Sequence, residues 1–366
     1  MSTRTGNEGG KDHLAVLARG PRPAGSAAER SAFDYVAGVL RGAGFTVHRE
    51  PFAYSEFPGR YGVPIGGALA AMTVACASAL GLLGAPIAAL ATLAIGALIT
   101  GTFASAMMGE GVLTLTWMRS ESENLVATRS SEAPNVWLVA HVDSKSQPVP
   151  SLLRVAGVAL VVLAVALAIT AGALQLAGLP HRMAWWGAIA GLVLGAPPVM
   201  ASIVGTRSDG AVDNASGVAA VLAAAAAVRP GVVFGVLISS AEELGMAGAR
   251  AWARTVSNGA GTALNCDGVD DEGELTLMYS ARAPRRLIET LRGVALTPVR
   301  VRRMPLGLAT DSVALAERGW TTITVSRGSL ATLRRVHTAS DSLARLRGDG
   351  IAEVSTLLAR AVEALA

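Results

Sequence analysis

Charged residues are scarce in this chain, and three long stretches contain none. Only 16% of the 366 residues are Asp, Glu, Lys or Arg, against about 25% in an ordinary soluble domain. The scarcity is local, because residues 61–109, 155–180 and 183–206 carry no charged side chain. A membrane-spanning helix needs roughly 20 apolar residues. The first stretch therefore predicts two spans that turn at residues 84–86, and the others predict one span each, in preference to buried core helices.

Cysteine and aromatic residues are also few. The two cysteines, Cys76 and Cys266, do not make a disulfide framework. Aromatic residues make up 4% of the chain, and no nucleic-acid-binding motif accompanies them. The N-terminal segment is polar and lacks the continuous apolar run of a secretory signal. We therefore expect the hydrophilic part of the protein in the cytoplasm, with no nucleic-acid partner.

The distribution of arginine predicts the orientation of the four spans. If they form two hairpins, every large hydrophilic segment lies on one side of the bilayer. The side with the hydrophilic segments carries four arginines close to the membrane. The opposite side carries one, Arg182, which lies in a short turn. The four are Arg60, Arg119, Arg154 and Arg207. By the positive-inside rule, this pattern predicts a multi-pass protein of a bacterial-type cell membrane whose hydrophilic part faces the cytoplasm.

The hydrophilic segments alternate between strand-like and helix-like patterns. Short apolar runs such as NVWLVAHVD and GVVFGVLISSAEE read as buried strands, and amphipathic segments lie between them. This alternation predicts an α/β fold with a mainly parallel sheet sandwiched between helices. Two helical hairpins interrupt it. The expected order is α/β sequence at 1–60, a hairpin at 61–109, α/β sequence at 110–154, a hairpin at 155–206 and α/β sequence at 207–366.

Polar residues cluster where the predicted strands end. In such sheets, ligands gather at the carboxyl ends of the strands, and side chains from separate strands can converge there. Imidazole and carboxylate groups without cysteine suit a zinc site. Singly, each residue has a plainer explanation, such as a helix cap for Asp213. The residues are His141, Asp143, Asp213, Glu242, Glu243, Asp267 and His337.

The adjacent pair Glu242 and Glu243 repel each other unless positive charge compensates. Two metal ions that share a water molecule and a bridging carboxylate would supply that charge. One glutamate could then bind metal while the other accepts and returns a proton during hydrolysis. The pair therefore predicts two distinct roles at one strand end.

Five short motifs resemble those of the di-zinc aminopeptidase family and follow one another in the order found in that family. The family includes bacterial leucyl aminopeptidases and glutamate carboxypeptidase II. The motifs HVD, GAVDNASG, EELGMAG, NCD and HTASD begin at His141, Gly210, Glu242, Asn265 and His337. The leading segment GPRPAGSAAERSAFDYVAGVLRGAGFTV resembles the start of that family's domain. The resemblance covers most of residues 13–54 and 124–366.

The resemblance implies a zinc-exopeptidase fold and a role for each motif residue. One zinc ion would be held by His141, Asp213 and Asp267, and a second by Asp213, Glu243 and His337, with Asp213 bridging. Glu242 would be the general base. Asp143 would orient His141 through its other ring nitrogen. Two further residues are expected near the site: Asp341, supporting the loop that carries His337, and Asp311, holding the substrate amine or a ligand.

These expectations make a membrane-anchored zinc aminopeptidase with peptide substrates the leading hypothesis. One alternative is an inactive relative that acts as a receptor or scaffold, although no ligand is missing. A second is a glutaminyl cyclase on the same fold with one zinc ion, against which the intact ligand set argues. A third is a carboxypeptidase, in which the arginine-rich stretch 282–303 would bind a substrate carboxylate, although this stretch more simply reads as a solvated face.

Overall fold

The computed structural model describes residues 6–179, 181–256, 261–305 and 307–366. The chain forms two compact units, each built from separate segments. One unit contains residues 1–55, 113–146 and 205–366, and we call it the α/β unit. The other contains residues 56–112 and 147–204, and we call it the helical unit. Each insertion into the α/β unit thus contributes half of the helical unit.

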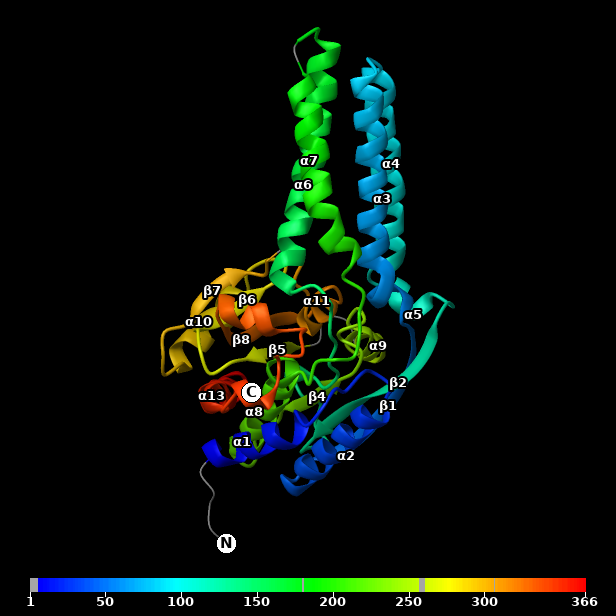
Figure 1. Ribbon diagram of the computed structural model, residues 1–366. Helices are drawn as coiled ribbons and strands as arrows, with labels where there is room; N and C mark the ends of the chain where they lie inside the picture. The colour runs from blue at the N-terminus through cyan, green and yellow to red at the C-terminus, as the bar shows by residue number, and fades with distance from the viewer. Residues whose placement is uncertain (1–5, 180, 257–260, 306) are drawn as a thin grey trace. The chain divides into compact units, whose positions relative to one another are not determined.

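The α/β unit is built on one sheet of eight strands in the order β1-β2-β4-β3-β5-β8-β6-β7 (Figure 1). The strands are β1 (Thr46–Ser55), β2 (Arg119–Thr128), β3 (Val136–His141), β4 (Gly235–Ser239), β5 (Thr262–Val269), β6 (Glu274–Tyr279), β7 (Arg300–Arg303) and β8 (Thr321–Gly328). Strands β4, β3, β5 and β8 run parallel to one another in the centre. Their carboxyl ends therefore meet at one edge of the sheet.

Helices cover both faces of this sheet because its central strands are apolar on both sides. In β3, Leu138 and Ala140 pack into a core with helices α1, α2, α8, α10 and α13. The alternate residues Trp137 and Val139 pack into a second core with α9 and α11. The helices are α1 (Gly6–Leu17), α2 (Ala27–Gly42), α8 (Gly217–Ala227), α9 (Ala247–Thr255), α10 (Arg285–Val294), α11 (Asp311–Ala316), α12 (Leu330–Arg335) and α13 (Asp349–Leu365).

The predicted parallel pairing is present at the centre of the sheet, and the described strands at its margins make the sheet mixed. The predicted α/β fold with helices on both faces is present, but three strand pairings are antiparallel: β1 with β2, β2 with β4, and β6 with β8. Strand β2 carries polar residues along its first half, where it pairs only with β1, so its sequence lacks the apolar run of a central strand. A mixed sheet with antiparallel strands at its margins is common among large sheets.

Both insertions start and end at paired backbone positions. Strands β1 and β2 form an antiparallel ladder in which Ser55 lies opposite Arg119, so the first insertion replaces the turn of a hairpin. The second insertion leaves after Ser146 and returns at Gly205, and these residues exchange two backbone hydrogen bonds of 2.9 and 2.7 Å. Each insertion therefore extends a loop of the α/β unit without interrupting its sheet.

The helical unit consists of two antiparallel hairpins (Figure 1). Its long helices are α3 (Phe57–Leu82), α4 (Pro86–Met107), α6 (Ser151–Leu176) and α7 (Arg182–Met200), and the single turn α5 (Gly111–Thr114) follows α4. All four long helices are long and apolar enough to cross a membrane. Small residues let the helices approach closely, as in membrane bundles. Gly157 of α6, for example, faces the backbone of Gly195 in α7.

Candidate metal centre

The residues predicted to act at the metal site come together near the carboxyl ends of the central strands. His141 is the last residue of β3, Glu242 and Glu243 follow β4, and Asp267 lies near the end of β5. Asp213 lies in the turn before α8, and His337 follows α12. This convergence has the topological cause expected from the sequence: parallel strands end at the same edge.

One group of three side chains contains His141, Asp213 and Asp267. The Nε2 atom of His141 lies 3.1 Å from Oδ1 of Asp213 and 3.7 Å from Oδ1 of Asp267. His141 is only 1% exposed. Its Nε2 atom is buried and makes no hydrogen bond of acceptable geometry with the described residues. A nitrogen in this position, facing two carboxylates, fits a zinc ligand.

A second group contains Asp213, Glu243 and His337. The Nε2 atom of His337 lies 2.9 Å from Oδ2 of Asp213 and 3.4 Å from Oε1 of Glu243. Asp213 therefore turns one carboxylate oxygen to each group. Oε1 of Glu243 is buried and has no hydrogen-bond partner among the described residues. The donor set of each group, imidazole plus carboxylates around buried ligand atoms, fits a zinc ion.

Glu242 lies beside both groups and belongs to neither. Its Oε2 atom is 3.8 Å from Nε2 of His141, and the residue is 7% exposed. Burial, reinforced by the charge of Glu243, raises the pKa of the Glu242 carboxyl well above its ordinary value. A carboxyl group with a raised pKa next to a metal centre is suited to accept and return a proton.

The charges of the cluster favour a bound cation. Burial disfavours a protonated His141, but Glu242 and the neighbouring aspartates outweigh it and raise the pKa of this histidine well above its ordinary value. Burial also disfavours an ionised Asp213, but the adjacent imidazoles of His141 and His337 lower the pKa of its carboxyl well below the usual range. The metal-free cluster therefore gathers protons that a metal ion would displace.

Comparison with known proteins agrees with this geometry. Peptidase family M28 matches residues 124–362, which is more than half of the chain. The chain belongs to peptidase family M28. The resemblance to di-zinc aminopeptidases expected from the motifs is therefore confirmed at the level of the family. No curated protein sequence matches the chain.

Solved structures share the fold of this M28 protein at low sequence identity. A zinc aminopeptidase from Bacillus subtilis superposes with a TM-score of 0.59 at 13% identity, covering 100% of this chain and 97% of that one. An aminopeptidase from Aneurinibacillus sp. strain AM-1 gives 0.58 at 13%, covering 97% and 93%. A glutaminyl cyclase from Fimbriiglobus ruber gives 0.56 at 14%, covering 100% and 98%. The fold is thus common to hydrolases and cyclases.

Asp143 contacts both His141 and the turn that carries the two glutamates. The Nδ1 atom of His141 lies 3.1 Å from the backbone carbonyl oxygen of Asp143 and 3.5 Å from its carboxylate. That carboxylate accepts hydrogen bonds from the backbone N–H groups of Glu242 and Glu243, each at 3.2 Å. Asp143 therefore fixes the turn of the two glutamates as well as the histidine ring, because its backbone and side chain have separate partners.

Asp341 and Asp311 are both buried near the candidate metal ligands. Asp341 follows His337, but its carboxylate accepts the backbone N–H groups of Val212 at 2.7 Å and Asp213 at 3.2 Å. Its carboxylate therefore holds the turn that contains Asp213, whereas the expectation was support of the loop that carries His337. Asp311 accepts a hydrogen bond from Ser239, and its other oxygen has no partner among the described residues. Burial raises the pKa of Asp341 to about 6 and of Asp311 to about 7.

Three supporting residues escaped sequence reasoning. Lys145 forms an ion pair of 2.6 Å with Glu243. The guanidinium of Arg22 is buried and donates to five backbone carbonyls, which belong to Leu17, Gly20, Val142, Asp209 and Gly210. The carboxylate of buried Glu29 accepts hydrogen bonds from the hydroxyls of Ser122 and Ser240. Ser240 lies two residues before Glu242. Lys145 could have been noticed in the sequence as a charge two residues after Asp143 in HVDSK. The contacts of Arg22 with Asp209 and of Glu29 with Ser240 join segments far apart in the chain, so they leave no local pattern.

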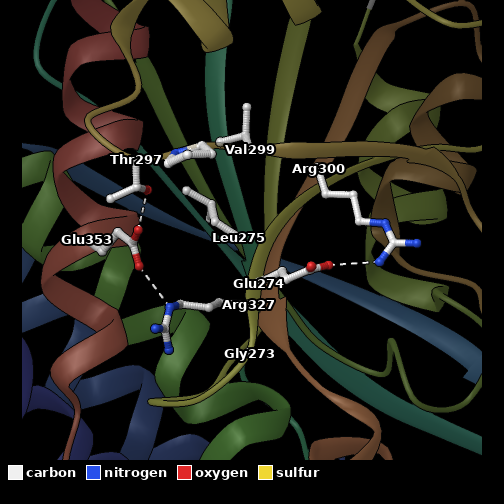
Figure 2. Close-up of a pocket in the computed structure, with 9 residues that line it drawn as sticks. Gly273, Glu274, Leu275, Thr297, Val299, Arg300, Arg327 and Glu353 are labelled. Atoms are coloured by element: carbon white, nitrogen blue, oxygen red, sulfur yellow. Dashed lines mark hydrogen bonds and ion pairs between the residues drawn. The ribbon is translucent and has the colours of Figure 1, made fainter.

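A cavity of about 460 Å³ lies elsewhere on the α/β unit, beside β6 and β7 (Figure 2). Two arginines line it, and each is paired with a glutamate: Arg300 with Glu274 at 2.8 Å, and Arg327 with Glu353 at 2.8 Å. Figure 2 shows Thr297 donating to the same Glu353. None of the metal-ligand candidates lines this cavity. Because each of these arginines is paired with a glutamate, the lining of the cavity does not indicate a charged ligand.

Proposed function

We propose that this M28 protein is a co-catalytic zinc peptidase that removes N-terminal residues from peptides. The observation that carries the proposal is the shared carboxylate: Asp213 turns one oxygen toward His141 and the other toward His337. Glu242 lies next to this pair of groups and outside both. Membership of a peptidase family supports the same reaction class.

The chain's residues divide the work of hydrolysis. His141, Asp213 and Asp267 would hold one zinc ion, and Asp213, Glu243 and His337 the other. When bound, zinc polarises a substrate carbonyl and lowers the pKa of a coordinated water. Glu242 would accept the proton of the attacking water and pass it to the leaving amine. The backbone hydrogen bonds from the glutamate turn to Asp143 keep Glu242 in place for both transfers.

The helical unit would anchor the enzyme in a lipid bilayer. Only 17–33% of the most apolar segment of each long helix is buried, which leaves large apolar side chains exposed. Met72, Ile87 and Leu98 are 61%, 74% and 71% exposed. Exposed apolar surface of this extent is costly in water and normal in lipid. Together with the arginine distribution, this supports four spans and a cytoplasmic catalytic unit.

Glutaminyl cyclisation is the second candidate function. Two solved structures that share the fold are glutaminyl cyclases, from Fimbriiglobus ruber and Bacteroides thetaiotaomicron. The two reactions leave different products from a peptide with N-terminal glutamine. A peptidase releases free glutamine, whereas a cyclase releases ammonia and leaves the rest of the peptide intact. Mass spectrometry of such a peptide after incubation distinguishes them directly.

The mechanism is tested by replacing Glu242 with glutamine in the full-length protein, purified in detergent with zinc. The Glu242→Gln variant keeps all metal-ligand candidates, so we expect it to retain zinc. Its kcat/KM on aminoacyl amides should fall by about 10²–10⁴, the usual contribution of a general base. Glu272→Gln, at an exposed glutamate, is the matched control and should behave as wild type. Full activity of Glu242→Gln would exclude Glu242 as the base.

A further inference from the structure

Lys145 is a half-buried cation whose role none of the motif assignments explains. It follows β3 by four residues and reaches the glutamate turn after β4. Its Nζ atom lies 2.6 Å from Oε2 of Glu243, and the two side chains are 15% and 3% exposed. A charge buried to this extent is costly when its partner is removed. This cost favours the conformation of Glu243 that keeps its carboxylate next to Lys145.

The two carboxylate oxygens of Glu243 face different groups. Oε2 contacts Lys145, whereas Oε1 lies 3.4 Å from Nε2 of His337 on the side of the second ligand group. Oε1 is buried without a hydrogen-bond partner among the described residues. The backbone N–H of Glu243 is held at 3.2 Å by Asp143. Glu243 is thus fixed through its backbone and one oxygen, and only the other oxygen faces the second ligand group.

We propose that Lys145 is a positioning residue that makes Glu243 a one-oxygen ligand of the second metal ion. The inference rests on the proposed metal centre and adds a role for a residue outside it. The ammonium group occupies Oε2, so Oε1 alone is presented to the metal. Residues that orient metal ligands typically change metal affinity by about 10- to 100-fold when they are replaced.

The test compares Lys145→Met with Lys145→Arg in the full-length protein. Methionine keeps the approximate length of the side chain but removes its charge and donors, and arginine keeps both. Lys11→Met is the matched control, because Lys11 forms an ion pair of 2.7 Å with Asp349 at the surface, where its side chain is 41% exposed. Zinc stoichiometry and affinity are measured by competition with a chromophoric chelator, and cobalt(II) substitution gives a visible absorption spectrum.

We expect wild type, Lys145→Arg and Lys11→Met to bind two zinc ions. Lys145→Met should bind one of the two at least about 10-fold more weakly. The cobalt spectrum of Lys145→Met should also lose intensity, because a released Glu243 that binds through both oxygens raises the coordination number. Lys145→Arg should restore the wild-type spectrum, which a general loss of stability would not explain. Circular dichroism checks that each variant is folded.

Two outcomes separate failure of this inference from failure of the metal centre. If wild type binds two zinc ions and Lys145→Met binds both with unchanged or higher affinity and an unchanged cobalt spectrum, the positioning role is wrong and the centre stands. If wild type binds no zinc after purification without chelator, the centre itself is wrong, and the role of Lys145 falls with it.

Discussion

Asp213 presents its two oxygens to two different histidines, and the backbone around it is held by Asp341. The two glutamates have similar supporting contacts: Asp143 fixes their turn, and Lys145 holds Glu243. Side chains therefore face the centre because buried hydrogen bonds fix their backbone, as a pre-organised metal site requires.

The buried carboxyl of Glu29 predicts an unusual dependence of stability on pH. Burial raises the pKa of this carboxyl to about 8, although hydrogen bonds from Ser240, Gly25 and Ser122 oppose the shift. The folded state therefore keeps a proton that the unfolded state loses at the ordinary glutamate value. Stability from this group is complete at low pH and is lost as pH rises toward about 8, by at most about 1.4 kcal/mol per pH unit.

Thermal unfolding of metal-free protein measures this effect. Wild type should lose stability over that pH range, and Glu29→Gln should show a flatter profile, because its amide does not titrate. Glu132→Gln, at an exposed glutamate, should keep the wild-type slope. Parallel profiles for wild type and Glu29→Gln would show that Glu29 ionises normally in the folded protein.

Motif residues could be predicted from sequence because their order and spacing are local signals, as for His141 and Glu242. The hydrogen-bond partners of Asp341 could not be predicted in this way. Its carboxylate accepts from a turn that lies 128 residues or more before it in the chain. Contacts of Arg22 and Glu29 have the same origin. Each depends on which distant segments the sheet brings together.

At the scale of elements, close helix packing defines the helical unit. A Cβ atom added at Gly157 of α6 would lie 2.8 Å from the backbone oxygen of Gly195 and 2.8 Å from the side chain of Pro198. A contact this short forces the helices apart. Gly101 of α4 offers a contrast, since an added Cβ would have no atom within 4 Å.

Gly157→Val should therefore destabilise the helical unit, by about 1–3 kcal/mol. Gly101→Val makes the same chemical change in another apolar helix of the unit and should have a much smaller effect. Thermal unfolding in detergent, followed by circular dichroism, measures both variants. Equal stability of the two would contradict the packing of α6 against α7.

Sequence periodicity located the long helices and the central strands, which are continuous and apolar. The expected strand in NVWLVAHVD corresponds to β3 at Val136–His141, and the strand expected in GVVFGVLISSAEE corresponds to β4 at Gly235–Ser239. Strands β2, β6 and β7 were not expected. β2 and β7 are rich in polar or charged residues, and β6 has only six residues, of which Glu274 and Thr276 are polar. The sequence of each strand therefore gives a weak local signal.

At the scale of the whole molecule, the chain combines an α/β unit of peptidase family M28 with a helical unit whose long helices are apolar enough to cross a membrane. The first insertion lies between two paired strands of the sheet, and the second lies between Ser146 and Gly205, which pair outside it. The unequal distribution of arginine around the apolar stretches predicts one orientation for the whole chain. The unequal number of arginines on the two sides can be counted from the sequence alone, without the fold.

Fusions at the C-terminus test that orientation. A fluorescent protein that matures only in the cytoplasm should fluoresce when fused after Ala366. A phosphatase that is active only outside the cytoplasm should remain inactive at the same position. A fusion inside the short turn near Arg182 is the control and should give the opposite pattern. An active phosphatase at the C-terminus would reverse the proposed topology.

Zinc content of Asp213→Asn is the most direct test of the central claim, that two metal ions share one carboxylate. The full-length wild type and variant are purified in detergent without chelator, and zinc per chain is measured by elemental analysis. Because Asp213 contributes to both ligand groups, we predict two zinc ions in wild type and loss of both from Asp213→Asn at equal free zinc. Retention of both ions by Asp213→Asn would contradict the shared carboxylate.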